Sequence, residues 1–93
     1  MNRRRLRVAA GREEHLARHN VTLNVTLAEA KQVFESNALV RRAALGRYTL
    51  IGQTDSGRYL VVVVAPREDG IYGLVTAREA EAHERRAYLR WQR

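Results

Sequence analysis

RYTLIGQTDSGRYLVVVVAPREDGIYGLVTAREAEAHERRAY, residues Arg47 to Tyr88, predicts most of the architecture of this protein. It contains three predicted strands, residues 47–53, 58–65 and 71–76. The turn at 54–57 has a glycine where a hairpin requires positive φ, and 66–70 form a second turn. The run Val61–Val64 does not alternate with polar residues, which is typical of a central strand covered on both faces.

Arginines lie at the joints of this stretch: Arg47 and Arg58 are the first residues of the first two strands, and Arg78 lies where the third strand gives way to a helix. The pattern Thr76-x-x-Glu79 predicts a capping box and a helix from Ala77 to about Trp91. An arginine in the first turn opposes the helix dipole unless an anion binds there. The planar guanidinium binds phosphate through two hydrogen bonds, so RNA is the first substrate to consider.

The inner face of this predicted helix contains one acidic residue, Glu84, in an apolar stripe. The stripe consists of Ala77, Ala80, Ala87 and Trp91. Glu84 is therefore expected to pair with Arg58 or with Arg78 and to fix the orientation of its guanidinium. Tyr88, one turn later, is more typical of a core residue with a hydrogen-bonded hydroxyl than of a catalytic group.

Composition limits the classes of function. The 93 residues predict a single domain, 1–93, with one modest core. The net charge is +7, and 16 of the 17 basic residues are arginine, which favours a nucleic acid or an acidic protein as partner. The absence of cysteine excludes disulfides, cysteinyl zinc sites and thiol nucleophiles. No apolar run is long enough for a membrane helix, and the start has no secretory signal, so a cytoplasmic location is expected.

The first half predicts smaller elements. Residues 6–8 favour a short strand and 11–19 a short helix, followed by a tandem repeat, NVTLNVTL, at 20–27. Thr26 and Glu29 form a capping-box pattern that starts a second helix, 27–35. Its apolar residues share one face: Leu27, Ala30, Val33 and Phe34. Residues 38–43 indicate an edge strand.

Metal chemistry has little support in the sequence. His15 and His19 lie four residues apart on the predicted first helix, a spacing that is able to bind metal, but no third ligand is near. There is no acidic pair, no glycine-rich phosphate loop and no nucleophile elbow. We therefore expect neither a metal nor a cofactor, and neither a metal-dependent nuclease nor an NTPase.

Five short pieces, in this order and spacing, resemble the BrnT family of ribonuclease toxins from type II toxin–antitoxin systems. They are RHNV at 18–21, LAEAKQVF at 27–34, GQTDSGR at 52–58, TAR at 76–78 and ERRAY at 84–88. The match covers about residues 11 to 90. The chain departs from the family pattern in its first third: the N-terminal Trp-Asp is missing, Asn20 replaces a glycine, His15 replaces an asparagine, and the NVTL unit is duplicated.

The resemblance implies an α+β, RelE-like fold, in which a small antiparallel sheet packs against two N-terminal helices and a C-terminal helix. It also implies a metal-independent endoribonuclease that inhibits translation and growth until a cognate antitoxin, a BrnA-like DNA-binding protein, neutralises it in a hetero-oligomer.

Roles for particular residues follow from the same resemblance. Arg58 and Arg78 would stabilise the charge that develops when the 2′-hydroxyl attacks the adjacent phosphorus, and Glu84 would orient one of them. His19 or Tyr88 would exchange protons. The other arginines expected to bind RNA are Arg18, Arg41, Arg42 and Arg47.

Two alternatives remain. The first is a non-catalytic relative that binds RNA or protein, has kept the fold and has lost the active site. The second, a DNA-binding regulator, is less favoured because no helix-turn-helix or ribbon-helix-helix pattern is present.

Overall fold

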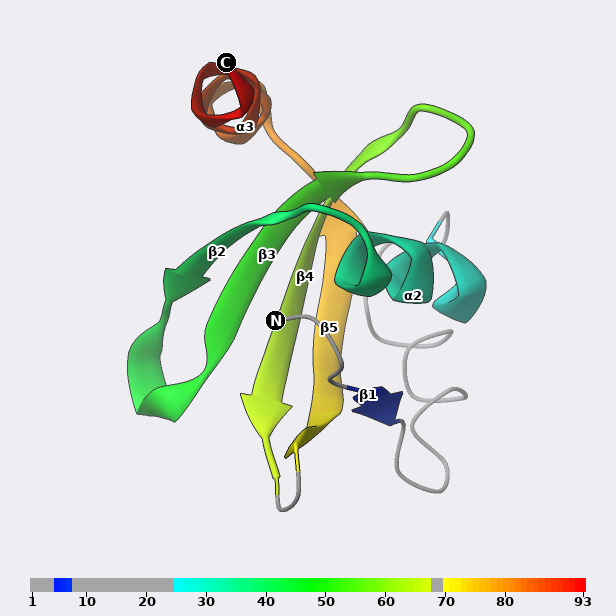
Figure 1. Ribbon diagram of the computed structural model, residues 1–93, viewed down its shortest axis with the longest axis vertical. Coiled ribbons are helices and arrows are strands. Elements are labelled where there is room, and N and C mark those ends of the chain that lie inside the picture. The colour runs from blue at the N-terminus through cyan, green and yellow to red at the C-terminus, as the bar shows by residue number, and fades with distance from the viewer. Residues whose placement is uncertain (1–4, 8–24, 68–69) are drawn as a thin grey trace.

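The computed structural model describes residues 5–7, 25–67 and 70–93, and these form an α+β domain (Figure 1). The strands are β1 (Arg5–Arg7), β2 (Leu39–Arg42), β3 (Tyr48–Gln53), β4 (Tyr59–Pro66) and β5 (Ile71–Glu79). The helices are α2 (Leu27–Glu35) and α3 (Ala82–Gln92), and a short 3₁₀ turn, η1 (Ala44–Gly46), joins β2 to β3. The strand order in the sheet is β1-β5-β4-β3-β2. Neighbours among β2 to β5 are antiparallel, and β1 pairs with β5 in parallel.

Helix α2 forms where its capping box predicts. Thr26 is the N-cap: its hydroxyl accepts from the Glu29 N–H at 3.1 Å, and its own N–H donates to Glu29 Oε1 at 2.9 Å. The helix ends at Ser36, whose hydroxyl donates to the Val33 carbonyl at 2.7 Å. The predicted apolar face is confirmed, because Ala30, Val33 and Phe34 are buried against the sheet and Leu27 packs at the edge of that core.

The two faces of the sheet are covered differently. On the side of α2, here called the α2 face, the large core contains Leu50, Leu60, Val62, Val64, Tyr72, Leu74 and Ala77. On the other side, called the α3 face, Ile51 and Val61 pack against Tyr88 of α3. Strand β4 lies in the middle of the order and contributes to both cores. The prediction of a central strand is therefore confirmed, while burial on both faces holds in part: the α2 face of β4 is buried at Leu60, Val62 and Val64, and the α3 face is buried at Val61.

A β-bulge sets which side each residue at the end of β5 faces. Val63 pairs with Thr76 but Val64 pairs with Leu74, so Val75 is an extra residue in β5. Before the bulge Leu74 lies on the α2 face; after it Ala77 lies there, and Arg78 faces the opposite side.

The predicted start of the C-terminal helix is wrong. Residues 76–79 continue β5, because Arg78 pairs with Val61 and Glu79 with Leu60, and the Ala80 N–H donates to the Tyr59 carbonyl at 2.9 Å. Helix α3 begins at Ala82, after a capping box formed by Glu81 and Glu84. Pairing with the central strand overrides the local capping signal at Thr76. Arg78 is therefore a strand residue, and the argument from the helix dipole does not apply to it.

The remaining sequence predictions divide into two groups. The short strand near the N-terminus is present as β1, and the edge strand is present as β2. The expected helix at 11–19 and the repeat at 20–24 lie outside the described residues, so only one of the two expected N-terminal helices, α2, is seen. In the described part, no helix is long and apolar enough to cross a membrane.

Candidate functional site

Arg78 and Glu84 form a two-pronged ion pair between β5 and α3. Arg78 Nη1 donates to Glu84 Oε1 at 2.8 Å, and Nη2 donates to Oε2 at 2.7 Å. Nη1 also donates to the Glu79 carbonyl at 3.1 Å. Glu84 is held from its other side, since its Oε1 accepts from the Glu81 N–H at 2.8 Å. The pair therefore fixes the plane of the Arg78 guanidinium at the end of the sheet.

The Arg78 guanidinium retains hydrogen-bonding capacity. A guanidinium has five N–H groups, and the three bonds of Arg78 use at most three of them. At least two N–H groups thus have no acceptor within residues 5–7, 25–67 and 70–93. The side chain of Arg78 is 43% exposed, whereas that of Glu84 is 14% exposed. The hydrogen bond from Arg78 lowers the pKa of Glu84, so the carboxylate stays charged and the guanidinium stays oriented.

Tyr88 lies beside this pair but belongs to the core. Its side chain is 4% exposed and packs edge-on to Tyr59 with ring centroids 6.0 Å apart. Its hydroxyl accepts from Gln92 Nε2 at 2.9 Å. Burial raises the pKa of Tyr88, so its hydroxyl is a poorer base at neutral pH than an exposed tyrosine.

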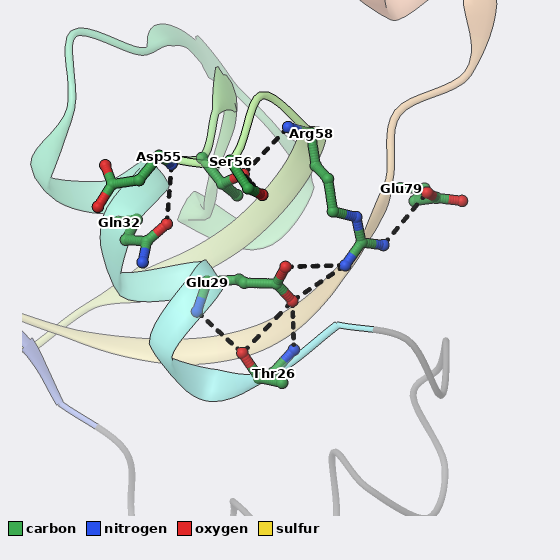
Figure 2. A network of polar contacts seen from close by, with 8 residues as sticks. Thr26, Glu29, Gln32, Asp55, Ser56, Arg58 and Glu79 are labelled. Carbon is green, nitrogen blue, oxygen red and sulfur yellow. Dashed lines mark hydrogen bonds and ion pairs between the residues drawn. The ribbon is translucent and has the colours of Figure 1, made fainter.

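Arg58 forms a second ion-pair network, on the α2 side of the sheet (Figure 2). Its Nη1 donates to both oxygens of Glu29, at 3.0 and 2.8 Å, and its Nη2 donates to Glu79 Oε2 at 3.2 Å. The side chains of Arg58 and Glu29 are 27% and 20% exposed. The hydrogen bond from the Thr26 backbone and those from Arg58 lower the pKa of Glu29. Arg58 thus joins the start of α2 to the end of β5.

The structure places Arg58 and Arg78 on opposite faces of the sheet. Arg78 pairs with Val61 on the α3 face, and Glu79 pairs with Leu60 on the α2 face, where it meets Arg58. Of the two pairings that the sequence left open for Glu84, the structure forms the one with Arg78. The register therefore does not bring the two arginines together into one clamp.

The other arginines expected to bind RNA are divided between the faces in the same way. Arg41 pairs with Thr49 on the α3 face, while Arg42 pairs with Tyr48 on the α2 face. Arg47 directly precedes Tyr48, so strand alternation places it on the α3 face. Arg18 and His19 lie outside the described residues.

Sequence reasoning missed the partners of Arg58. Glu29 was identified only as a capping residue, and Glu79 was assigned to a helix that begins later in the chain. The pairing with Glu29 joins residues that are 29 positions apart. In the sequence, the capping-box residue Glu29 was the one indication that a carboxylate is available to pair with Arg58.

Among the described residues, Glu81, His83 and Glu84 form a cluster of possible metal ligands, with ligand atoms within 4.8 Å of one another. Glu84 pairs with Arg78, and Glu81 is the N-cap of α3 and donates its backbone N–H to Glu84 Oε1. His83 Nδ1 lies 3.6 Å from Glu81 Oε1, and both side chains are well exposed. The start of a capped helix accounts for this cluster without a metal.

Comparison with known proteins gives a likeness in fold. The sequence matches no protein-family profile and no curated protein. The structure is similar to the crystal structure of the Brucella abortus ribonuclease toxin BrnT, with a TM-score of 0.57 and 14% sequence identity. The similarity covers 84% of this chain and 97% of that one. The chain therefore has a fold distantly related to that of BrnT-like toxins.

Proposed function

We propose that this chain is a metal-independent endoribonuclease toxin of a type II toxin–antitoxin system. The observation that carries the proposal is the Arg78 guanidinium, which Glu84 holds in a fixed plane while at least two of its N–H groups stay available. A charge-stabilising group that is already oriented costs no reorganisation during the reaction. The likeness in fold to a protein described as a ribonuclease toxin supports the same conclusion.

The proposed reaction needs positioning and charge stabilisation rather than a metal. The 2′-hydroxyl of RNA attacks the adjacent phosphorus in line, the bond to the 5′-oxygen of the next nucleotide breaks, and a cyclic phosphate and a free 5′-hydroxyl result. Arg78 donates to the phosphoryl oxygens as negative charge develops, and Glu84 acts as a positioning residue. Burial and a raised pKa weigh against Tyr88 in proton transfer, so we assign that role to His19.

The geometry gives Arg58 a supporting role in this proposal. Its guanidinium lies on the α2 face among the carboxylates of Glu29 and Glu79. We propose that Arg58 stabilises the fold at the end of β5 and does not contact the phosphate at which cleavage occurs.

The proposal includes a partner and a compartment. An active ribonuclease arrests growth, so a cognate antitoxin must neutralise it, and a BrnA-like DNA-binding protein in a cytoplasmic hetero-oligomer fits this role. Coexpression with the product of an adjacent reading frame, followed by copurification, is the corresponding test.

The decisive experiment measures RNA cleavage by the purified chain in excess EDTA, beside Arg78→Ala and Arg42→Ala. Arg42 was expected from the sequence to bind RNA, but it is exposed on the other face of the sheet from Arg78, so we propose that it has no contact with the RNA and use it as the matched control. We expect products with 5′-hydroxyl ends, a rate loss of about 10²–10³ in Arg78→Ala by analogy with other charge-stabilising groups, and little change in Arg42→Ala. Full activity in Arg78→Ala would contradict the proposal.

One observation favours the second candidate, a non-catalytic relative that binds RNA or protein. Arg58, the other arginine that the sequence assigns to catalysis, is engaged with two carboxylates on the opposite face. Absence of cleavage by the unmodified chain, with RNA binding intact, would support this alternative.

A further inference from the structure

Gly73 makes room for an arginine on the α3 face of β5. It lies between Tyr72 and Leu74, which both face the α2 core, so its own missing side chain would point to the α3 face. A Cβ at this position would lie 2.6 Å from Nε of Arg67 and 3.2 Å from its Nη2. Only a residue without a side chain leaves that space to the Arg67 guanidinium, which therefore lies directly on the sheet.

Two further arginines belong to the same face. Arg41 is at its edge on β2, and Arg47 stands before β3. Between these two and Arg67, the strands present small or half-buried side chains: Thr49, Val63, Ala65, Val75 and Thr76. Tyr88 packs against Ile51 and Val61, at the Arg78 end of this face, and no helix of the described part packs on the rest. We call Arg41, Arg47 and Arg67 the arginine track.

The described part of the chain does not neutralise the charges of the arginine track. In β2 to β5 the one acidic residue is Glu79, and it lies on the α2 face. Across residues 5–7, 25–67 and 70–93, no track arginine forms an ion pair, in contrast to Arg58 and Arg78. Three cations on a face where strands β2 to β5 have no acidic residue favour a polyanionic ligand.

We propose that the arginine track binds the phosphates of single-stranded RNA and leads the strand to Arg78. Along β4, the row of Arg78 (opposite Val61) and the row of Gly73 (opposite Ala65) are four residues apart, about 13 Å at ~3.3 Å per residue. Arg67 and Arg47 lie on either side of β4. On this one face of the sheet, a flexible single strand is able to reach the cations on both sides of β4. A rigid duplex would touch the same surface only along a line.

This inference rests on the proposed function in one respect, the cleavage of the bound RNA at Arg78. RNA binding to the arginine track is measured separately, without cleavage. The probe is a fluorescent single-stranded RNA of mixed sequence with 2′-O-methyl groups, which lacks the attacking hydroxyl. Affinity is measured by anisotropy over a series of salt concentrations for the unmodified chain and for Arg67→Ala, Arg41→Ala, Gly73→Ala and Arg42→Ala. A duplex of the same sequence is measured in parallel, and thermal melts verify that each variant is folded.

Arg67→Ala and Arg41→Ala should each weaken binding several-fold and reduce the slope of log K against log salt by about 0.7, the value for one phosphate contact to a single strand. Gly73→Ala should behave like Arg67→Ala although it leaves the net charge unchanged, because the new methyl displaces a flexible guanidinium and not backbone. Arg42→Ala, next to Arg41 but on the other face, should leave the slope unchanged.

Three results would overturn the inference. If Arg42→Ala weakens binding as much as Arg41→Ala, RNA responds to net charge and not to this face. If Gly73→Ala binds like the unmodified chain, the position of the Arg67 guanidinium over Gly73 has no role in RNA binding. Tighter binding of the duplex would exclude a single-stranded ligand. Intact track binding with no cleavage of unmodified RNA would contradict the proposed function alone.

Discussion

Replacing Glu29 with alanine tests the network that joins α2 to the sheet. Two kinds of contact disappear: the carboxylate no longer accepts from the Thr26 N–H, and Arg58 loses its ion pair with Glu29 at 2.8 Å while it keeps the one with Glu79. The charge-assisted cap is worth about 0.5–1 kcal/mol, and a partly exposed ion pair is worth about 0.5–1 kcal/mol. The better helix propensity of alanine returns a few tenths of a kcal/mol.

The expected loss in the free energy of unfolding for Glu29→Ala is therefore about 1 kcal/mol. In a domain of this size, a loss of that magnitude lowers the melting temperature by roughly 4–8 °C. Glu29→Gln retains an acceptor for Thr26 and loses only the ionic part, so its Tm should lie between the two. Circular dichroism measures the unmodified chain and the two variants, with thermal melts for Tm and urea denaturation for the free energy of unfolding.

Glu35→Ala is the matched control. Glu35 lies in the last turn of the same helix, is exposed, and forms no ion pair in the described part of the chain, so its loss should change stability by less than about 0.5 kcal/mol. A double-mutant cycle with Arg58→Ala isolates the pair. Equal effects of Glu29→Ala and Glu35→Ala, or strictly additive effects of Glu29→Ala and Arg58→Ala, would refute the reasoning.

Glu84→Gln should lower cleavage about tenfold or more and leave KM little changed, since Arg78 keeps its charge but loses its fixed plane; a normal kcat would contradict this. Tyr88→Phe should retain cleavage within a few-fold, because the Tyr88 hydroxyl is buried and, among the described contacts, only accepts a hydrogen bond from Gln92. A loss of cleavage above about a hundredfold would show that Tyr88 is catalytic. The pKa values of Glu29 and Glu84 are below the ordinary value, so their stabilisation is complete above about pH 4.3 and lost as pH falls further. Urea midpoints should drop at acid pH, less steeply in Glu29→Gln, and a midpoint independent of pH would exclude this linkage. Leu45 is exposed and has φ 62°. Leu45→Asn should stabilise the chain by about 0.5–1 kcal/mol, because asparagine tolerates that backbone conformation; a lower Tm for the variant would count against this.

The elements that the sequence predicted correctly depend on short-range signals. Helix α2 is encoded by Thr26, Glu29 and an apolar face within nine residues, and the β3–β4 hairpin by Gly57, whose φ is +95°. The end of β5 depends on pairing with β4, which local patterns do not encode. Thr76 therefore looked like a cap although Glu81 performs that role.

The candidate site was predictable in its residues but not in its geometry. Arg78 and Glu84 are six residues apart, and both were recognised. The face that Arg58 occupies depends on strand register, and its partners lie 29 and 21 residues away. Gly73 and Arg67 gave no signal, because the space above a glycine appears only after the strand has been placed in the sheet.

The extra residue of β5 has a consequence for how proteins with this topology diverge. Side chains alternate along a strand, so if Val75 took a regular place in the ladder instead of forming the bulge, Arg78 and Glu79 would exchange sides. Arg78 would then face Glu29, and Glu79 would face α3. The face on which Arg78 lies thus depends on one bulged residue of the backbone and not on the identity of Arg78 itself. Deletion of Val75 together with the bulge would leave Arg78 and Glu79 on their present sides, so a one-residue gap at this point of an alignment is compatible with an unchanged site.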